Sequence, residues 1–97
     1  MYLKMHPGPS GEVAALCDAE LLGRVLSSGS IRLDLKKHAG FYEGRKVTHK
    51  EAVSALASSA NANLVGKKSL EAAKEAGLDV SSAILILGVP HLQVYRL

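Results

Sequence analysis

The residues whose chemistry could serve a function are concentrated near the end of the chain. His91, Gln93 and Tyr95 alternate there with the aliphatic Leu92 and Val94. Because successive side chains of a β-strand point to opposite faces of a sheet, this alternation predicts that the imidazole, amide and phenol groups share one face. Such a face can stack against a planar ligand and form hydrogen bonds with it.

The start of the chain has a similar alternation, which places Tyr2, Lys4 and His6 on one face. If the first and last strands are neighbours in one sheet, these three side chains join the three polar residues of the last strand. Nucleic-acid bases stack on Tyr and His rings, and Lys neutralises phosphate, so the combined face would suit RNA. An ordinary solvated sheet face is the alternative interpretation.

A second candidate surface is the predicted helix start that runs from Gly66 through Lys67 and Lys68 to Ser69. Free backbone N–H groups at a helix N-terminus, together with a lysine, are the means by which a phosphate loop holds its ligand. The glycine-rich cradle of such a loop is missing upstream. This argues against nucleotide hydrolysis and leaves a simple anion contact.

Two pairs of residues have both a structural and a binding interpretation. Asn61 and Asn63 are candidate ligand contacts, but we expect them to cap or tie a turn. Phe41 and Tyr42 lie between glycines in a predicted loop over residues 36–46 and could dock a partner. The alternative, which we favour, is that this loop folds its aromatic rings back over the core.

Patterns for catalysis and metal binding are weak. Nucleophilic catalysis needs Cys17 or a serine beside an oriented histidine, and the four histidines follow no recognised local pattern. We expect Cys17 to be buried, and a metal site made by His6 and His91 would require their strands to pair. His91 as a general acid or base stays an alternative, because imidazole titrates near neutral pH. We predict no cofactor and no metal ion.

The composition predicts one domain over residues 1–97. Hydrophobic residues make up 47% of the chain and aromatic residues 4%, so the core must consist of aliphatic and small side chains. The single cysteine fits a reducing compartment, and no segment suits a signal peptide or a membrane span; we expect a cytoplasmic protein without a membrane partner. The net charge of +3 is a weak argument for an anionic partner.

Strands and helices are expected to interleave along the chain. The Pro and Gly residues of 7–11 predict a hairpin, and Thr48 and Glu51 form a capping box. The expected strands are 2–6, 12–17, 31–35, 61–65, 84–87 and the last segment, and the expected helices are 18–26, 48–60 and 66–76. This order predicts an α+β fold, a two-layer sandwich in which about three helices pack on one side of a mixed sheet.

Three of these elements carry more detailed expectations. Asp18 is a good N-cap for the helix at 18–26, whose apolar residues follow helical spacing. The alternation in 31–35 places Ile31 inward together with Leu33 and Leu35. The continuous apolar run at 84–87 is typical of a strand that is covered on both faces.

Four short motifs, CDAELLG ending at Gly23, FYEG ending at Gly44, NLVG ending at Gly66 and GVPH ending at His91, follow one another along the chain, and Gln93 comes after the last. In this order and spacing the chain resembles an archaeal family of small proteins, domain of unknown function 424 (DUF424). The resemblance implies no established enzyme activity, and the archaeal distribution implies an association with translation or RNA metabolism. The matching positions are Asp18, Gly23, Phe41, Gly44, Asn63, Gly66, Gly88, Pro90 and His91.

Three hypotheses about function follow. The first is a noncatalytic module that binds RNA or a ribonucleoprotein; the residues assigned to it are His91, Gln93, Tyr95, Lys4, Lys67 and Lys68. The second is a protein-interaction or homodimeric subunit, in which Phe41, Tyr42 and the last strand form the interface, for example by edge pairing. The third is a small enzyme that uses His91.

Overall fold

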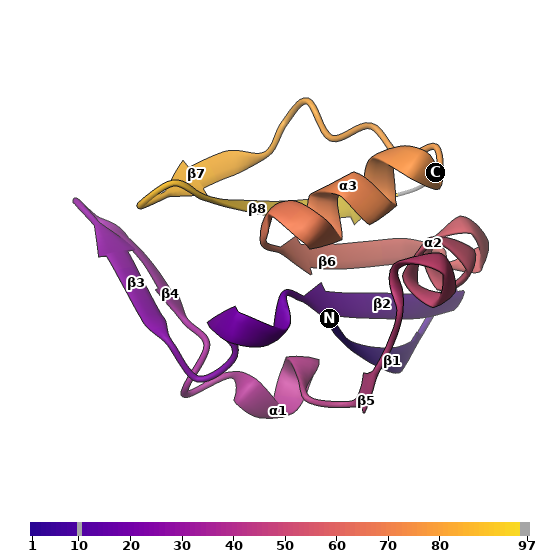
Figure 1. Ribbon diagram of the computed structural model, residues 1–97, viewed down its shortest axis with the longest axis horizontal. Coiled ribbons are helices and arrows are strands. Elements are labelled where there is room, and N and C mark those ends of the chain that lie inside the picture. Colours follow the sequence, from indigo (N-terminus) through magenta and orange to yellow (C-terminus); the bar gives the residue numbers. More distant parts are fainter. Residues whose placement is uncertain (10, 96–97) are drawn as a thin grey trace.

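A mixed six-stranded sheet, with the strand order β5-β1-β2-β6-β8-β7, forms the frame of the protein (Figure 1). The structure is a computed structural model that describes residues 1–9 and 11–95. The strands of this sheet are β1 (Tyr2–Gly8), β2 (Gly11–Cys17), β5 (Arg45–Lys46), β6 (Asn61–Val65), β7 (Ile84–Ile86) and β8 (Val89–Tyr95). A separate two-stranded ribbon consists of β3 (Val25–Ser28) and β4 (Ile31–Asp34). The predicted α+β class is confirmed.

The predicted hairpin at the start of the chain forms between β1 and β2, where Tyr2 pairs with Cys17 and Gly8 with Gly11. Ser10, in the expected turn, lies outside the described residues. Strand β2 then pairs in parallel with β6, and β6 pairs antiparallel with β8. A parallel pair requires a crossover connection, and the ribbon and two helices lie within the segment that makes it.

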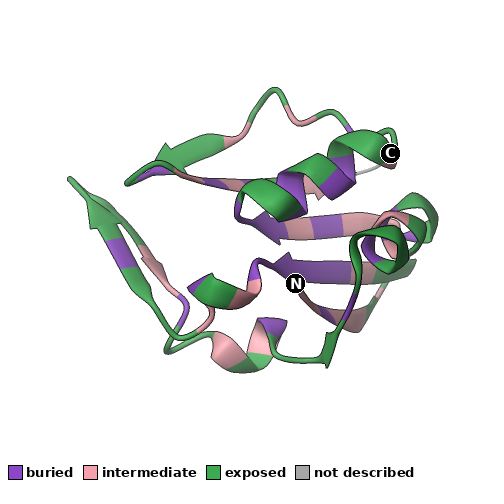
Figure 2. Cartoon of the chain, in the orientation of Figure 1, coloured by how far each residue is buried: buried purple, intermediate pink, exposed green. Residues whose placement is uncertain are grey.

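Helices α2 (His49–Ser58) and α3 (Lys67–Glu75) pack on one face of the sheet. The predicted capping box starts α2, because Glu51 N–H donates to Thr48 Oγ1 at 3.2 Å and Thr48 N–H donates to Glu51 Oε1 at 3.0 Å. Leu56 and Leu70 from the two helices meet the aliphatic residues of the central strands in the main core. Figure 2 shows how burial is concentrated on β2 and β6. In the described ranges, no helix is long and apolar enough to cross a membrane.

The opposite face of the sheet is covered at one end only. A short 3₁₀ helix, η1 (Ala19–Leu21), helix α1 (Ala39–Tyr42) and the ribbon lie on this side (Figure 1). Leu21, Leu35 and Tyr42 from these segments pack on Cys17 and Val65 in a second core cluster. The other end of the same face stays open, and the side chains of Asn61, Asn63, Gln93 and Tyr95 lie there.

The predicted helix at 18–26 is wrong. Only η1 is helical, and the chain enters strand β3 at Val25. The backbone pairs across the ribbon instead, since Gly23 N–H donates to the Leu35 carbonyl and Leu35 N–H donates to the Arg24 carbonyl. Asp18 is also not the cap of a local helix, because its carboxylate binds elsewhere. Tertiary contacts therefore override the helical spacing of these residues.

Two predictions of burial are also wrong. Ile31 was expected inward, yet it is 45% exposed because the tip of the ribbon extends past the sheet. The apolar run 84–87 was expected to be covered on both faces, yet Ile84 and Leu85 are 46% and 68% exposed and only Ile86 is buried. The reason is topological: β8 pairs with β6, which leaves β7 at the edge of the sheet.

Candidate functional site

The polar residues of the first and last strands share one face of the sheet, although these strands are not neighbours. Two strands, β2 and β6, separate β1 from β8, so the direct pairing on which the combined face was conditional does not occur. Residues that are in register across adjacent strands point to the same face. One row of registered residues consists of His6, Val13, Asn61 and Tyr95, and the next row consists of Lys4, Ala15, Asn63 and Gln93.

The β6 and β8 residues of these rows lie at the uncovered end of the face opposite α2 and α3, whereas α1 packs beside the β1 and β2 residues, of which Ala15 is fully buried. Gln93 and Tyr95 are exposed, and Asn61 and Asn63 are half-buried. A shallow hollow of about 380 Å³ lies over them. We call the surface made by His6, Phe41, Asn61, Asn63, Gln93 and Tyr95 the open face.

The side chains of β1 fix helix α1 at the border of the open face. The His6 and Phe41 rings stack with centroids 4.3 Å apart and planes inclined by 9°. His6 Nε2 also lies 2.8 Å from the Phe41 carbonyl oxygen, to which its N–H donates, and Lys4 Nζ donates to the Gly40 carbonyl at 2.8 Å. The ring of Phe41 thus has a fixed position beside the sheet.

Tyr42 and Phe41 have different environments despite being adjacent. Tyr42 is 5% exposed in the second core cluster, and burial raises the pKa of its phenol to about 12. Phe41 is half-buried, meets the Tyr42 ring edge-on at 5.1 Å, and lines the hollow over the open face. For Tyr42 the loop folds back over the core, and Phe41 is the member of the pair that borders accessible space.

Asn61 and Asn63 do not tie a turn, in contrast to the structural role that we favoured. Both lie within β6, at the centre of the sheet, where Asn61 pairs with Tyr95 and Asn63 with Gln93. Amides at these positions place donors and acceptors in the middle of the open face.

A second hollow, of about 290 Å³, adjoins the first at the position of His91. Phe41, Asn63 and Gln93 line both hollows, so the two lie side by side on this face. Burial lowers the pKa of His91, so its imidazole is neutral at pH 7. His91 therefore adds a neutral hydrogen-bonding group to the second hollow.

The environment of His91 offers little support for acid–base catalysis. Among residues 1–9 and 11–95, no carboxylate or thiol forms a hydrogen bond with its ring. Cys17 lies in the same registered row as His91, with Val65 between them. The usual spacing of strands places Cys17 and His91 about 10 Å apart. Burial raises the pKa of the Cys17 thiol to about 12, which keeps it protonated.

The N-terminus of α3 is occupied by a carboxylate of the chain itself. Asp18 is 3% exposed and accepts hydrogen bonds from Lys68 N–H at 3.1 Å and from Ser69 N–H and Oγ, both at 2.8 Å. These N–H groups were the predicted anion contact. Sequence reasoning missed this role of Asp18, although the resemblance motifs contain both Asp18 and Gly66.

Gly66 is required at this helix start for a geometric reason. Its φ of 107° is unfavourable for other residues, and a Cβ atom here would collide with the Asp18 carboxylate. The exposed Lys67 and Lys68 border a separate hollow beside Pro90. The structure therefore does not bring these lysines to the open face, whereas Lys4 lies in one of its rows.

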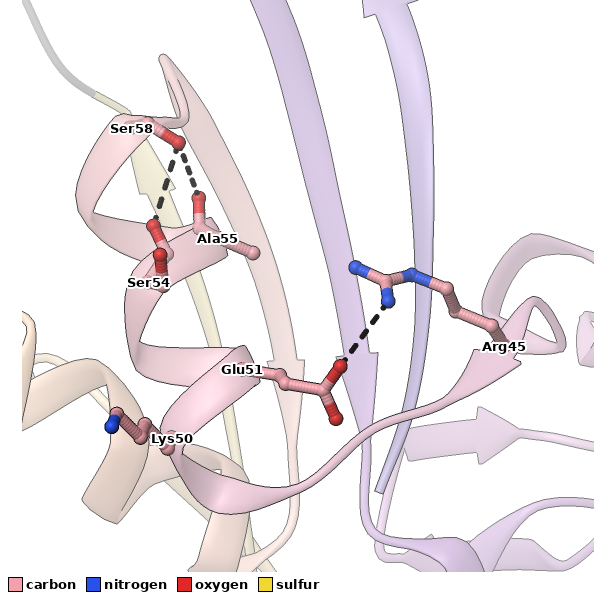
Figure 3. A pocket seen from close by; sticks show the side chains of 6 residues that line it. All are labelled: Arg45, Lys50, Glu51, Ser54, Ala55 and Ser58. Carbon is pink, nitrogen blue, oxygen red and sulfur yellow. Dashed lines mark hydrogen bonds and ion pairs between the residues drawn. The ribbon is translucent and has the colours of Figure 1, made fainter.

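Another hollow, of about 400 Å³, lies between Arg45 and α2 (Figure 3). Arg45 forms an exposed ion pair with Glu51 at 3.5 Å, and the Ser58 hydroxyl lies within hydrogen-bonding distance of the Ser54 and Ala55 carbonyls of its own helix. These polar groups bind one another, so we assign no ligand to this hollow.

The structure separates the two histidines considered for a metal. His6 lies in the row of Tyr95, and His91 lies in the row of Tyr2, three strands away from β1. Strand pairing, which that site required, does not occur. In the part of the chain that the structure describes, no three His, Cys, Asp or Glu side chains form a group that could hold a metal ion.

Comparisons with known proteins identify the family. The structure matches the crystal structure of an uncharacterized conserved protein from Methanopyrus kandleri with a TM-score of 0.80 and 25% sequence identity, covering 99% of this chain and 93% of the other. The comparison with curated proteins gave no match. The family model described as "Protein of unknown function (DUF424)" matches residues 7–97. The chain therefore belongs to the DUF424 family, as its motifs indicate.

Proposed function

We propose that this protein is a noncatalytic module that binds single-stranded RNA on the open face. The observation that carries the proposal is the register of β1, β2, β6 and β8, which aligns His6 and Asn61 with Tyr95, and Asn63 with Gln93, on the sheet face opposite α2 and α3, which helix α1 borders but does not cover at β6 and β8. An exposed sheet face with aromatic and amide side chains is a common platform for unpaired bases.

Aromatic rings at both ends of the open face support base stacking. Tyr95 is 71% exposed, and its hydroxyl donates to Gln93 Oε1 at 3.3 Å. At the other end, the stacked rings of His6 and Phe41 form a rigid border. Stacking on an aromatic ring contributes about 1–3 kcal/mol per base, so two such positions would give measurable affinity.

The amides between the rings support recognition of base edges. Asn61, Asn63 and Gln93 each carry a donor and an acceptor group, as the Watson–Crick edge of a base does. His91 extends this set with a neutral imidazole. Bases in a duplex do not expose these edges, so the face should favour unpaired RNA over a duplex.

Charge contributes less to this proposal than stacking does. The net charge is +3, and Lys4 is the lysine that lies in the rows of the open face. With one or two phosphate contacts, the affinity for a single strand should fall about three- to sevenfold between 50 and 200 mM salt. A much steeper dependence would indicate binding by surface lysines instead.

The test is fluorescence anisotropy with short single-stranded RNA of mixed sequence, at several salt concentrations. Tyr95→Ala and Asn63→Ala should weaken binding by about tenfold or more, in line with the loss of one stacked base or of base-edge contacts. Lys50→Ala is the matched control, because it removes a positive charge from α2 on the covered side. Equal weakening by all three variants, or no binding by the wild type, would exclude the proposal.

A further inference from the structure

The two edges of the main sheet differ in a way that points to a partner. Strand β5 at one edge has only Arg45 and Lys46, both charged and exposed. Short length and charge are the usual means by which proteins keep a sheet edge from pairing. Strand β7 at the other edge is also short but lacks the charge, since its residues are Ile84, Leu85 and Ile86.

The backbone of Leu85 faces the open side of this edge. Leu85 is opposite Pro90, which has no N–H, so these two residues form a pair without mutual hydrogen bonds. The Pro90 carbonyl accepts from Gly66 N–H at 2.9 Å, on the other side of β8. In an antiparallel pair of this kind, the N–H and C=O of Leu85 point away from β8, where another strand can bind them.

Apolar side chains surround this free backbone. Leu85 and Leu87 are 68% and 66% exposed, and Ile84 is 46% exposed. Leu87 also has a φ of 52° in the β7–β8 turn, a conformation that leucine adopts rarely. The ribbon of β3 and β4 also contacts β7. Clustered exposed apolar residues of this kind mark an interaction surface.

The charge distribution favours a second copy of the chain as the partner. Each copy carries a net charge of +3, so two copies repel unless they meet where charge is absent. From Val80 to Tyr95 the sequence contains no Asp, Glu, Lys or Arg. The sequence of β7 also reads Ile-Leu-Ile around Leu85, so an antiparallel copy places an apolar residue opposite each apolar residue.

We infer that the protein forms a homodimer in which β7 pairs antiparallel with β7 of a second copy, with the two-fold axis at Leu85. The Leu85 N–H of each copy donates to the Leu85 carbonyl of the other. The contact is short, so the dimer should be in equilibrium with the monomer. A two-fold axis in this position is perpendicular to the sheet, which places the open faces of both copies on the same side.

The test is the molar mass in solution, measured without RNA by sedimentation equilibrium from micromolar to millimolar concentration. The wild type should change from one chain to two. Leu85→Pro removes the N–H and Leu85→Lys adds a charge, and both should give the mass of one chain throughout. Leu85→Val keeps the N–H and the apolar side chain, so it should still dimerise.

Circular dichroism of each variant establishes that it is folded. A wild type that keeps the mass of one chain at every concentration would overturn the homodimer, and so would a dimer that neither Leu85→Pro nor Leu85→Lys weakens. Because no RNA is present, these outcomes do not depend on whether the open face binds it.

Discussion

The Asp18 carboxylate and Ser69, 51 residues apart in the sequence, form a buried hydrogen-bonded pair that joins η1 to the start of α3. Ser69 donates to Asp18 Oδ1 with both its N–H and its hydroxyl, each at 2.8 Å. Because a helix start carries unpaired N–H groups and partial positive charge, a carboxylate here stabilises α3. The pair also fixes the covered end of the sheet face.

Asp18→Ala should lower the free energy of unfolding by about 2–3 kcal/mol, since it removes a cap and leaves buried donors without acceptors. Asp18→Asn should cost less, because an amide oxygen can still accept from Ser69. Urea denaturation measures both. Glu20→Ala, an exposed position in the same segment, is the control and should change the free energy of unfolding by less than about 0.5 kcal/mol.

Gly66→Ala should destabilise the protein by about 2–4 kcal/mol, from backbone strain and from collision with Asp18. Gly77 has a φ of 89° and no neighbour near an added carbon. Gly77→Ala should therefore show the effect of backbone strain alone and lower the free energy of unfolding by less than Gly66→Ala does. In the Asp18→Ala background the cost of Gly66→Ala should shrink, because the colliding carboxylate is gone. Additive changes in the free energy of unfolding in this double-mutant cycle would contradict a close contact between position 66 and Asp18.

The lowered pKa of His91 predicts how stability depends on pH. The folded state favours the neutral imidazole, whereas the unfolded chain binds a proton at its ordinary pKa of about 6.5. The free energy of unfolding should therefore fall as pH decreases below about 6.5, and this fall should end below the lowered pKa. Urea denaturation across this range should show a smaller pH dependence for His91→Gln than for the wild type. An identical dependence would mean that His91 is not the group responsible.

Leu87→Asn should stabilise the isolated chain by about 1 kcal/mol. Leu87 and Gly88 have φ values of 52° and 78°, the signs of a type I′ turn, for which Asn-Gly is the preferred sequence. Unfolding at low protein concentration keeps association out of the measurement. Leu85→Asn is the comparison, because it replaces an equally exposed leucine in ordinary strand conformation and should give no gain.

Local signals predicted the parts of this fold that depend on neighbouring residues. The capping box at Thr48, the first hairpin and the alternation from His91 to Tyr95 all formed as expected. The order of strands is a long-range property, so the sequence did not show that β2 and β6 separate His6 from Tyr95. The polar residues of β1 and β8 share a face without direct pairing, because registered residues lie on the same side of a sheet across any number of strands.

Two further features could not be read from local sequence for the same reason. The partner of Asp18 is 51 residues away, so its position before an apolar segment looked like a local cap. The apolar run at Ile84 looks like an interior strand, and only the pairing of β8 with β6 makes it an edge. Burial and capping depend here on tertiary contacts rather than on spacing.

Binding of single-stranded RNA to the open face is tested most directly by mapping backbone amide chemical shifts in an NMR titration with a short unpaired RNA. We predict that the largest changes occur at Asn61, Asn63, Gln93 and Tyr95, with smaller changes at Phe41. Changes confined to Lys67, Lys68 and the start of α3, or no changes at saturating RNA, would contradict the proposal.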